Sequence, residues 1–234
     1  MTLVIAHRGD TKQATENTLE AISAAVRKGA DGIETDLRLS ADGIPFLFHD
    51  KTLERLAGRP EKVEKLTWRE LREVRLQGNL QIPTLDNLCE IAGEELLLNI
   101  ELKASSLQES RRMADAVTSL VGNRNPNRFL FSSFNPVSLY YLKKKLPRFR
   151  IGMLFAEQTI FFSRQPWARR WLKPYSLHPS IKLATDEKIQ QYRREGFEIF
   201  VWTVNEENDI QRLTSLGVTG IITDHLELAR RIVK

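Results

Sequence analysis

The chain has 234 residues, with 35 Lys and Arg against 30 Asp and Glu, which gives a formal net charge of +5 at pH 7. A composition that is 41% hydrophobic and 28% charged is typical of a globular protein, and it excludes a disordered, collagen-like or coiled-coil chain. The single cysteine, Cys89, excludes an intramolecular disulfide and a cysteine-based zinc site, so we expect a reducing, cytoplasmic environment.

The first residues predict a strand rather than a leader peptide. Residues 1–6 are a short apolar run without a basic segment or a cleavage signal, and His7-Arg8-Gly9 follows at once. No apolar run approaches the roughly 20 residues that cross a bilayer, so no integral membrane segment is expected. The basic residues form only small clusters along the chain, which argues against a nucleic-acid partner.

Short apolar runs alternate with helical patterns along the chain. The first helical pattern places Leu19, Ile22 and Val26 on one stripe, with Asn17 as the expected cap and Gly29 at its end. Candidate strands are residues 3–6, 32–39, 96–103, 128–131, 150–155, the neighbours of 176, 198–203 and 219–222. Candidate helices are 84–91, 107–120, 136–146, 186–194, 206–216 and 227–233. Eight strands alternating with helices predict an α/β fold, a closed TIM-type (β/α)8 barrel, as one domain over residues 1–234.

Two segments depart from this alternation. Residues 51–83 are polar, with one helical pattern at 67–74, and we expect a small insertion after the second strand, packed near the barrel mouth. Residues 159–172 mix Phe161, Phe162, Trp167 and Trp171 with arginines. A barrel helix with an ordinary core face is the first expectation, because Pro166 breaks any long amphipathic helix, and peripheral contact with a membrane surface is the alternative.

Acidic side chains collect at the ends of two predicted strands. Glu34 and Asp36 are two residues apart on one strand, so they share a face. The same alternation places Asn99, Glu101 and Lys103 on one face of the strand that follows the insertion. The carboxyl ends of parallel barrel strands form one rim, where active sites are built. Three carboxylates without a cysteine predict an all-oxygen site for a hard divalent cation, Mg²⁺ or Ca²⁺.

Two histidines have comparable places. His7 ends the first apolar run and precedes Arg8, and His49 ends the short apolar run after the second strand. A histidine at a strand end can move a proton near neutral pH, so His7 and His49 are candidates for a general acid/base pair. His178 and His225 have no comparable setting and are expected to be structural.

Several short motifs occur in a fixed order. They are His7-Arg8-Gly9, Glu16-Asn17-Thr18, GADGIETD at 29–36, DGIP at 42–45, His49-Asp50, NIELK at 99–103, FSSF at 131–134, WTVN at 202–205 and GIITD at 220–224. This set closely resembles the glycerophosphodiester phosphodiesterase family, over residues 5–224. Two positions depart from the family pattern: Thr15 stands where proline is usual, and RLA at 55–57 replaces an Arg-Thr-Thr run.

The resemblance implies a TIM-type barrel that hydrolyses glycerophosphodiesters to glycerol 3-phosphate and an alcohol with a divalent metal. Carried over by position, it implies metal ligands at Glu34, Asp36 and Glu101, an acid/base pair at His7 and His49, phosphate contacts from Arg8 and Lys103, and substrate contact by Trp202. Trp202 could equally be an inner-layer aromatic of the barrel. Either histidine could be the base.

Two other functions are compatible with the sequence. One is lysophospholipase D-type hydrolysis of lysophospholipids, with the aromatic segment at 161–171 holding the acyl chain at a membrane surface. The other is a non-catalytic barrel that binds phosphodiesters, which is disfavoured because every expected catalytic position is filled. The preferred head group, the choice between Mg²⁺ and Ca²⁺ and the oligomeric state stay open at this stage.

Overall fold

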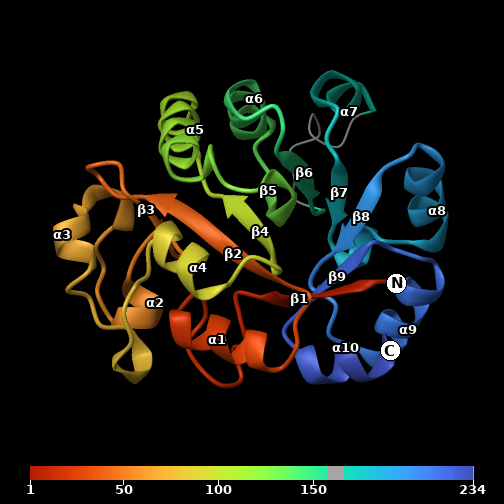
Figure 1. Cartoon of the computed structure of the whole chain (residues 1–234), viewed down its shortest axis with the longest axis horizontal. Helices are drawn as coiled ribbons and strands as arrows, with labels where there is room; N and C mark the ends of the chain where they lie inside the picture. The colour runs from red at the N-terminus through yellow and green to blue at the C-terminus, as the bar shows by residue number, and fades with distance from the viewer. Residues whose placement is uncertain (158–165, 234) are drawn as a thin grey trace.

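The computed structural model describes residues 1–157 and 166–233, without the side chains of 166–168. Eight parallel strands run around a closed barrel in the order β1-β9-β8-β7-β6-β5-β4-β2, and β1 pairs with β2 to close it (Figure 1). They are β1 Leu3–His7, β2 Gly32–Leu39, β4 Leu97–Leu102, β5 Phe129–Ser133, β6 Arg150–Phe155, β7 Ser176–Pro179, β8 Glu198–Val201 and β9 Gly220–Thr223. The predicted TIM-type barrel is confirmed.

Helices surround the barrel, and all but α7 lie at the predicted places within a few residues at each end. They are α1 Leu19–Arg27, α4 Leu85–Ile91, α5 Leu107–Val121, α6 Pro136–Lys145, α7 Pro166–Leu172, α8 Asp186–Arg194, α9 Glu207–Ser215 and α10 Leu226–Ile232. The helix expected over 159–172 is described only from Pro166, because 159–165 lie outside the described residues. The expected cap of the first helix is wrong, because Thr18 rather than Asn17 accepts the hydrogen bond from the Ala21 amide. No helix in the described part of the chain is both long and apolar enough to cross a bilayer.

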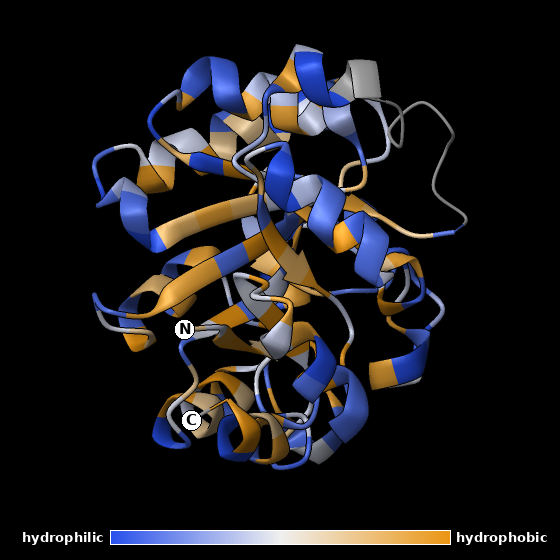
Figure 2. Ribbon diagram, turned by 90° about the vertical axis from the view of Figure 1, so that its right-hand side faces the viewer, coloured by the Kyte–Doolittle hydropathy of each residue, from blue (hydrophilic) through white to orange (hydrophobic). Residues whose placement is uncertain are grey.

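Apolar side chains fill two layers of the barrel. The hydrophobic strands lie inside a shell of helices whose outward faces are hydrophilic (Figure 2). A large buried cluster between strands and helices includes Ile33, Leu98 and Phe131. Inside the barrel, Ile5, Leu130, Phe200 and Ile222 form a separate buried cluster, with Leu3, Leu97 and Trp202 packed against it. This apolar cluster fills the barrel interior. The polar residues further along the strands therefore lie above a packed core and do not line an open channel.

The predicted insertion lies beside an additional strand. Strand β3, Pro45–Leu47, pairs antiparallel with β2, and α2 Glu54–Ala57 and α3 Trp68–Leu71 follow it. Short 3-10 turns occupy η1 Val63–Lys65, η2 Gln77–Asn79, η3 Pro126–Arg128 and η5 Ile181–Leu183. Helix α3 is shorter than the predicted 67–74, because it ends one turn after its Thr67–Glu70 capping box. The segment packs on β3 through its own apolar cluster, which includes Phe46, Leu53 and Leu71.

The His178 side chain is buried inside the barrel. Its Nε2 lies 2.8 Å from the Ser176 hydroxyl, and its ring packs on Phe200 at 5.1 Å. The ring occupies space that Gly152 on the neighbouring strand leaves open, since a Cβ there would lie 2.4 Å from Nε2. Burial lowers the pKa of His178 to about 3, so the imidazole is neutral in the folded protein.

This burial predicts a loss of stability in acid. In the unfolded chain the histidine has a pKa of about 6.5, so it binds a proton as the pH falls below that value. In the folded protein His178 stays neutral until the pH reaches about 3, so acid favours the unfolded state. His178 therefore costs about 2 kcal/mol of unfolding free energy between pH 7 and pH 5. Urea unfolding at the two pH values is expected to show this loss in the wild type and a smaller one in His178→Asn. Equal losses would contradict a neutral buried imidazole.

Candidate active site

The register of three strands brings the predicted polar residues together. His7 on β1 is level with Glu34 on β2, and Glu34 is level with Asn99 on β4. Two residues further on, Asp36 is level with Glu101. Glu34, Asp36 and Glu101 are all buried, and each offers a carboxylate oxygen within 4.8 Å of the others. Alternation along two paired strands thus builds one cluster of three carboxylates.

Two cations contact this cluster. The Lys103 Nζ lies 2.7 Å from a Glu101 oxygen and 3.0 Å from Asp36 Oδ1. The Arg8 Nε lies 3.0 Å from Asp36 Oδ2, and its Nη1 donates a 3.0 Å hydrogen bond to Glu16. Asp36 therefore lies between both predicted phosphate-binding residues. Three carboxylates face two cations here, so the cluster has a formal deficit of positive charge.

The pKa values of the three carboxyl groups diverge. Burial, with repulsion from Asp36, raises the pKa of Glu34 to about 8. Burial also raises the pKa of Glu101, although Lys103 opposes it. Burial acts on Asp36 in the same direction, but Lys103 and Arg8 outweigh it and hold the pKa of Asp36 well below its usual range. Without a further cation, burial and repulsion from Asp36 favour the protonated form of Glu34.

The donor set fits a divalent cation. Glu34 Oε2 is buried and has no hydrogen bond to any residue in the described part of the chain, and the same is true of both side-chain polar atoms of Asn99. Unpartnered buried polar atoms are costly and indicate that a ligand, ion or water completes the site. Carboxylate oxygens are the ligands that Mg²⁺ and Ca²⁺ prefer, whereas no cysteine lies in this cluster.

Each candidate histidine has a carboxylate partner on its Nδ1. His7 Nδ1 lies 2.7 Å from Asp224, just after β9, and His49 Nδ1 lies 2.7 Å from Asp50. Burial lowers the pKa of His7, but Asp224 and Glu34 outweigh it and the pKa is raised. Burial lowers the pKa of His49, and Lys103 and Arg8 act in the same direction against Asp36. A carboxylate on Nδ1 fixes the orientation of each ring.

Asn17 holds the acid cluster in place. It has a φ of 57°, in the left-handed region that asparagine tolerates better than most residues. Its amide nitrogen donates to Asp36 Oδ2 at 2.9 Å, and its carbonyl oxygen accepts hydrogen bonds from Thr35 Oγ1 and the Asp36 amide. Asn17 therefore orients a candidate ligand, a role that the cap interpretation missed.

We expect Asn17→Ala to reduce kcat more than it raises KM. The variant leaves the buried Asp36 carboxylate without one of its donors and forces alanine into a left-handed conformation, at a combined cost of about 2–4 kcal/mol in stability. Asn17→Gly removes the same hydrogen bonds while tolerating the backbone conformation. If kcat falls equally in both folded variants, the amide positions Asp36. Full activity in Asn17→Gly would show that only the backbone matters.

A cavity of about 200 Å³ opens between the histidines and the acid cluster. One side of it is polar, and Phe134, Leu154, Trp202 and Ile222 line the other. Trp202 follows β8; its Nε1 donates to the His178 carbonyl at 2.8 Å, and its ring meets Phe134 edge to face at 5.5 Å. Trp202 is thus both a packed aromatic and a wall of the cavity.

A second cavity, of about 190 Å³, shares Glu101, Lys103 and Phe134 with the first. Arg38 and Lys51 also line it. The Arg38 guanidinium donates two hydrogen bonds, of 3.0 and 2.6 Å, to the His49 carbonyl oxygen. Arg38 therefore fixes the backbone that carries His49.

Thr15, which departs from the family pattern, and Arg55, which precedes the departures at Leu56 and Ala57, both bond across loops near the site. Arg55 donates to Asp50 at 2.6 Å and to both Glu16 oxygens, at 2.9 and 2.7 Å. Thr15 Oγ1 donates to the Gln77 carbonyl at 2.9 Å. These bonds tie the inserted segment to the loop after β1, and Arg55 links it to the partner of His49.

A parallel barrel with three carboxylates that could hold a metal ion, beside two carboxylate-paired histidines, is the architecture expected of a hydrolytic enzyme. The glycerophosphoryl diester phosphodiesterase family model matches residues 7–228. A glycerophosphodiester phosphodiesterase of Caldanaerobacter subterraneus subsp. tengcongensis is 34% identical over 244 residues, covering 100% of this chain and 98% of that protein. The chain belongs to the glycerophosphoryl diester phosphodiesterase family.

Solved structures agree with this assignment. The crystal structure of glycerophosphodiester phosphodiesterase from Thermotoga maritima is 32% identical with a TM-score of 0.82, covering 99% of this chain and 98% of that one. An Oleispira antarctica phosphodiesterase, solved in complex with the product sn-glycerol-3-phosphate, is 27% identical with a TM-score of 0.88, covering 100% of this chain and 97% of that one.

Proposed function

We propose that this protein is a metal-dependent phosphodiesterase that hydrolyses glycerophosphodiesters to glycerol 3-phosphate and an alcohol. The observation that carries the proposal is the buried cluster of Glu34, Asp36 and Glu101 beside two histidines, in a member of this family. The product bound to the Oleispira antarctica phosphodiesterase supports the substrate class. We also propose that residues 1–234 act as one domain, with 51–83 as an insertion.

Glu34, Asp36 and Glu101 would hold the cation, Mg²⁺ or Ca²⁺. A bound divalent cation would stabilise negative charge on the phosphate oxygens of the substrate. Arg8 and Lys103 add fixed positive charge on the same side of the cavity, where the phosphate would lie. Because both already contact Asp36, they are held in position before the substrate arrives.

His7 and His49 would carry out the proton transfers. One removes the proton from the attacking oxygen, either water or the free hydroxyl of the substrate's own glycerol, and the other protonates the departing alcohol. Attack by water gives glycerol 3-phosphate directly, whereas attack by the glycerol hydroxyl gives a cyclic phosphate that one water molecule then opens to glycerol 3-phosphate. Asp224 and Asp50 orient the two rings through Nδ1, which leaves Nε2 of each ring for the substrate. His7 lines the cavity from the end of β1 and His49 from the segment after β3, so they can act on different oxygens of one phosphate.

The two cavities would separate the halves of the substrate. The first, at about 200 Å³, is smaller than the roughly 300 Å³ at which pockets for drug-sized ligands begin, so it suits glycerol and phosphate alone. Trp202 and Phe134 would pack on the glycerol carbons. The leaving alcohol would lie toward the second cavity, beside Arg38 and Lys51.

A substrate panel tests this function. Purified protein supplied with Mg²⁺ or Ca²⁺ is incubated with glycerophosphocholine, glycerophosphoethanolamine, glycerophosphoglycerol and a lysophospholipid, and glycerol 3-phosphate and free alcohol are quantified. We expect release of glycerol 3-phosphate from the deacylated substrates. Turnover of the lysophospholipid alone would replace the proposal with lysophospholipase D-type activity. Tight binding without turnover of any substrate would leave a non-catalytic phosphodiester-binding barrel.

A further inference from the structure

Positive charge is concentrated in one segment of the chain. Residues 136–182 contain ten Lys and Arg and a single acidic residue, Glu157. This segment is therefore more positive than the whole chain, whose net charge is +5, and the remaining residues are together net negative. A charge asymmetry of this kind gives one side of the protein a positive electrostatic potential, which attracts anionic partners to that side.

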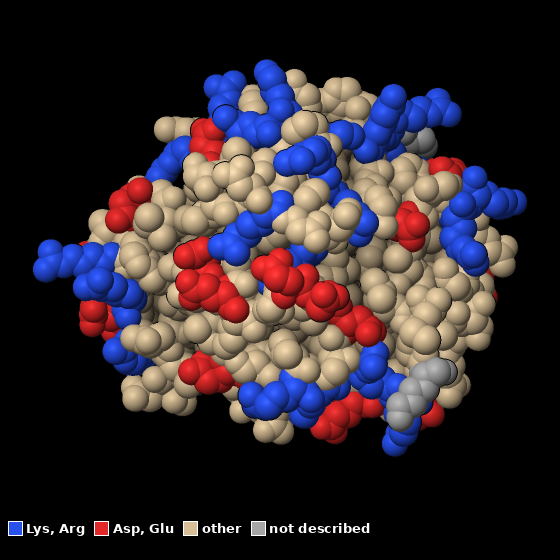
Figure 3. Space-filling model, in the orientation of Figure 1, with Lys and Arg blue, Asp and Glu red and all other residues tan. Residues whose placement is uncertain are grey.

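The fold places the described cations of α6 and α7 on one side of the barrel. Lys and Arg side chains gather over α5, α6 and α7 along one edge of the face in Figure 3, whereas acidic side chains lie across its middle. Lys143, Lys144 and Lys145 form the last turn of α6. The Lys143 Nζ donates to the carbonyl oxygens of Leu172 and Lys173, at 2.9 Å each, so α6 and the end of α7 form one continuous surface.

Exposed aromatic rings occur on the same surface. Among the described residues, the exposed Phe, Trp and Tyr side chains are Tyr140, Trp171 and Tyr175, at 40%, 54% and 38% exposure. Tyr140 and Trp171 stack with their ring centres 5.1 Å apart, and the Arg150 guanidinium lies 4.9 Å above the Tyr175 ring. Trp and Tyr beside long basic side chains are typical of the membrane–water interface, where the rings enter the headgroup region.

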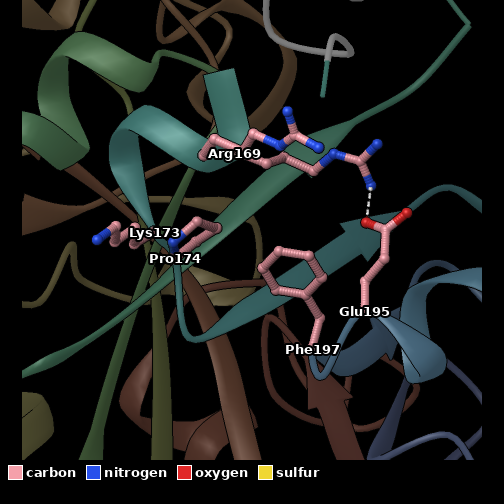
Figure 4. Close-up of a pocket in the computed structure, with 6 residues that line it drawn as sticks. Arg169, Lys173, Pro174, Glu195 and Phe197 are labelled. Carbon is pink, nitrogen blue, oxygen red and sulfur yellow. Dashed lines mark hydrogen bonds and ion pairs between the residues drawn. The ribbon is translucent and has the colours of Figure 1, made fainter. Parts of the chain in front are cut away.

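A basic cavity of about 480 Å³ is lined by residues that flank Trp171 and Tyr175 in the chain. Arg169, Arg170 and Lys173 line it. Figure 4 shows Arg169 above the Phe197 ring, with Glu195 beside it. Arg169 is paired with Glu195 at 3.2 Å, so its charge is largely balanced. Arg170 and Lys173 are exposed and have no ion pair with another described residue, which leaves both free for an anionic group such as a lipid phosphate.

We propose that the α6–α7 surface, defined by Tyr140, Lys144, Arg170, Trp171 and Lys173, docks the protein on an anionic phospholipid bilayer. Charge complementarity provides the attraction, and Trp171 and Tyr140 provide the contact with the headgroup region. A nucleic acid is the less suitable partner, because Tyr140 and Trp171 already cover one face of each other, which leaves only one face of each ring for stacking on bases. The inference does not depend on the proposed activity, although docking would hold the enzyme near phospholipids, whose deacylation supplies glycerophosphodiesters.

Co-sedimentation with vesicles tests the proposal. The full chain is mixed with vesicles of phosphatidylserine and phosphatidylcholine, or of phosphatidylcholine alone, at low and physiological ionic strength. We expect binding to the anionic vesicles only, weakened by salt. The double variant Arg170→Gln, Lys173→Gln is expected to bind about tenfold or more weakly, because each basic residue near the surface contributes independently to the attraction.

A charge-matched variant controls for net charge. Lys62→Gln with Arg69→Gln removes two exposed cations from the inserted segment and is expected to leave vesicle binding unchanged. Trp171→Ala is expected to weaken binding even at low salt, where attraction between charges is strongest. Three results would overturn the proposal: no binding to anionic vesicles, an equal loss in the two double variants, or displacement from vesicles by a single-stranded oligonucleotide that binds more tightly.

Discussion

Glu101→Gln is expected to reduce the release of glycerol 3-phosphate by about a thousandfold or more, since each 1.36 kcal/mol of lost transition-state stabilisation is a factor of ten. Glutamine keeps the size of the side chain and an oxygen that can accept from Lys103. It removes one of three negative charges that would hold the cation. The loss should therefore appear as weaker metal binding in calorimetry, with the fold intact by circular dichroism.

Glu95→Gln is the matched control for this experiment. Glu95 is exposed just before β4, at the other end of the strand that carries Glu101. The control is expected to keep both metal affinity and activity. Retention of full metal affinity in Glu101→Gln would show that the carboxylate cluster is not the metal site.

His49→Ala and His7→Ala are each expected to lower kcat by about 10²–10⁴, the usual contribution of a positioned general acid or base. Both side chains line the cavity and each has its own carboxylate partner, so one cannot take over the role of the other. Because neither is a proposed ligand, both variants should bind the metal as the wild type does. This pattern separates them from Glu101→Gln, which loses metal binding and activity together.

The partners of the histidines provide a finer test. Asp50→Asn is expected to reduce kcat less than His49→Ala, because the imidazole remains but is less well oriented. Activity is measured over a range of pH at saturating metal. Near-normal rates in His49→Ala would exclude proton transfer by that residue. A rate in Asp50→Asn as low as that of His49→Ala would assign Asp50 a larger role than orientation.

The three carboxylates could be predicted from the sequence, because period-two alternation is a local property. Glu34 and Asp36 share a face whatever the tertiary structure, and the strand ends of a parallel barrel share a rim. The register added what alternation alone cannot: Asp36 is paired with Glu101 and Glu34 with Asn99. The closed parallel barrel itself was predicted from a different pattern, the succession of strands and helices along the chain.

The residues that orient the site could not be predicted in the same way. Asp224 is 217 positions from His7, and only the closure of the barrel through β1 and β9 brings them together. Asparagine is a common helix-capping residue, so the sequence favoured that role for Asn17. Its left-handed backbone and its hydrogen bond to Asp36 depend on the fold of the loop. The apolar cluster of the inserted segment depends on long-range packing on β3 that a polar sequence did not indicate.

The most direct test of the central claim is the release of glycerol 3-phosphate from glycerophosphoglycerol by protein freed of metal with EDTA, as Mg²⁺ or Ca²⁺ is added back. The account predicts no release without metal, recovery that saturates with added cation, and no recovery in Asp36→Asn. Undiminished release by the metal-free protein, or full recovery in Asp36→Asn, would contradict a reaction that depends on a cation held by Glu34, Asp36 and Glu101.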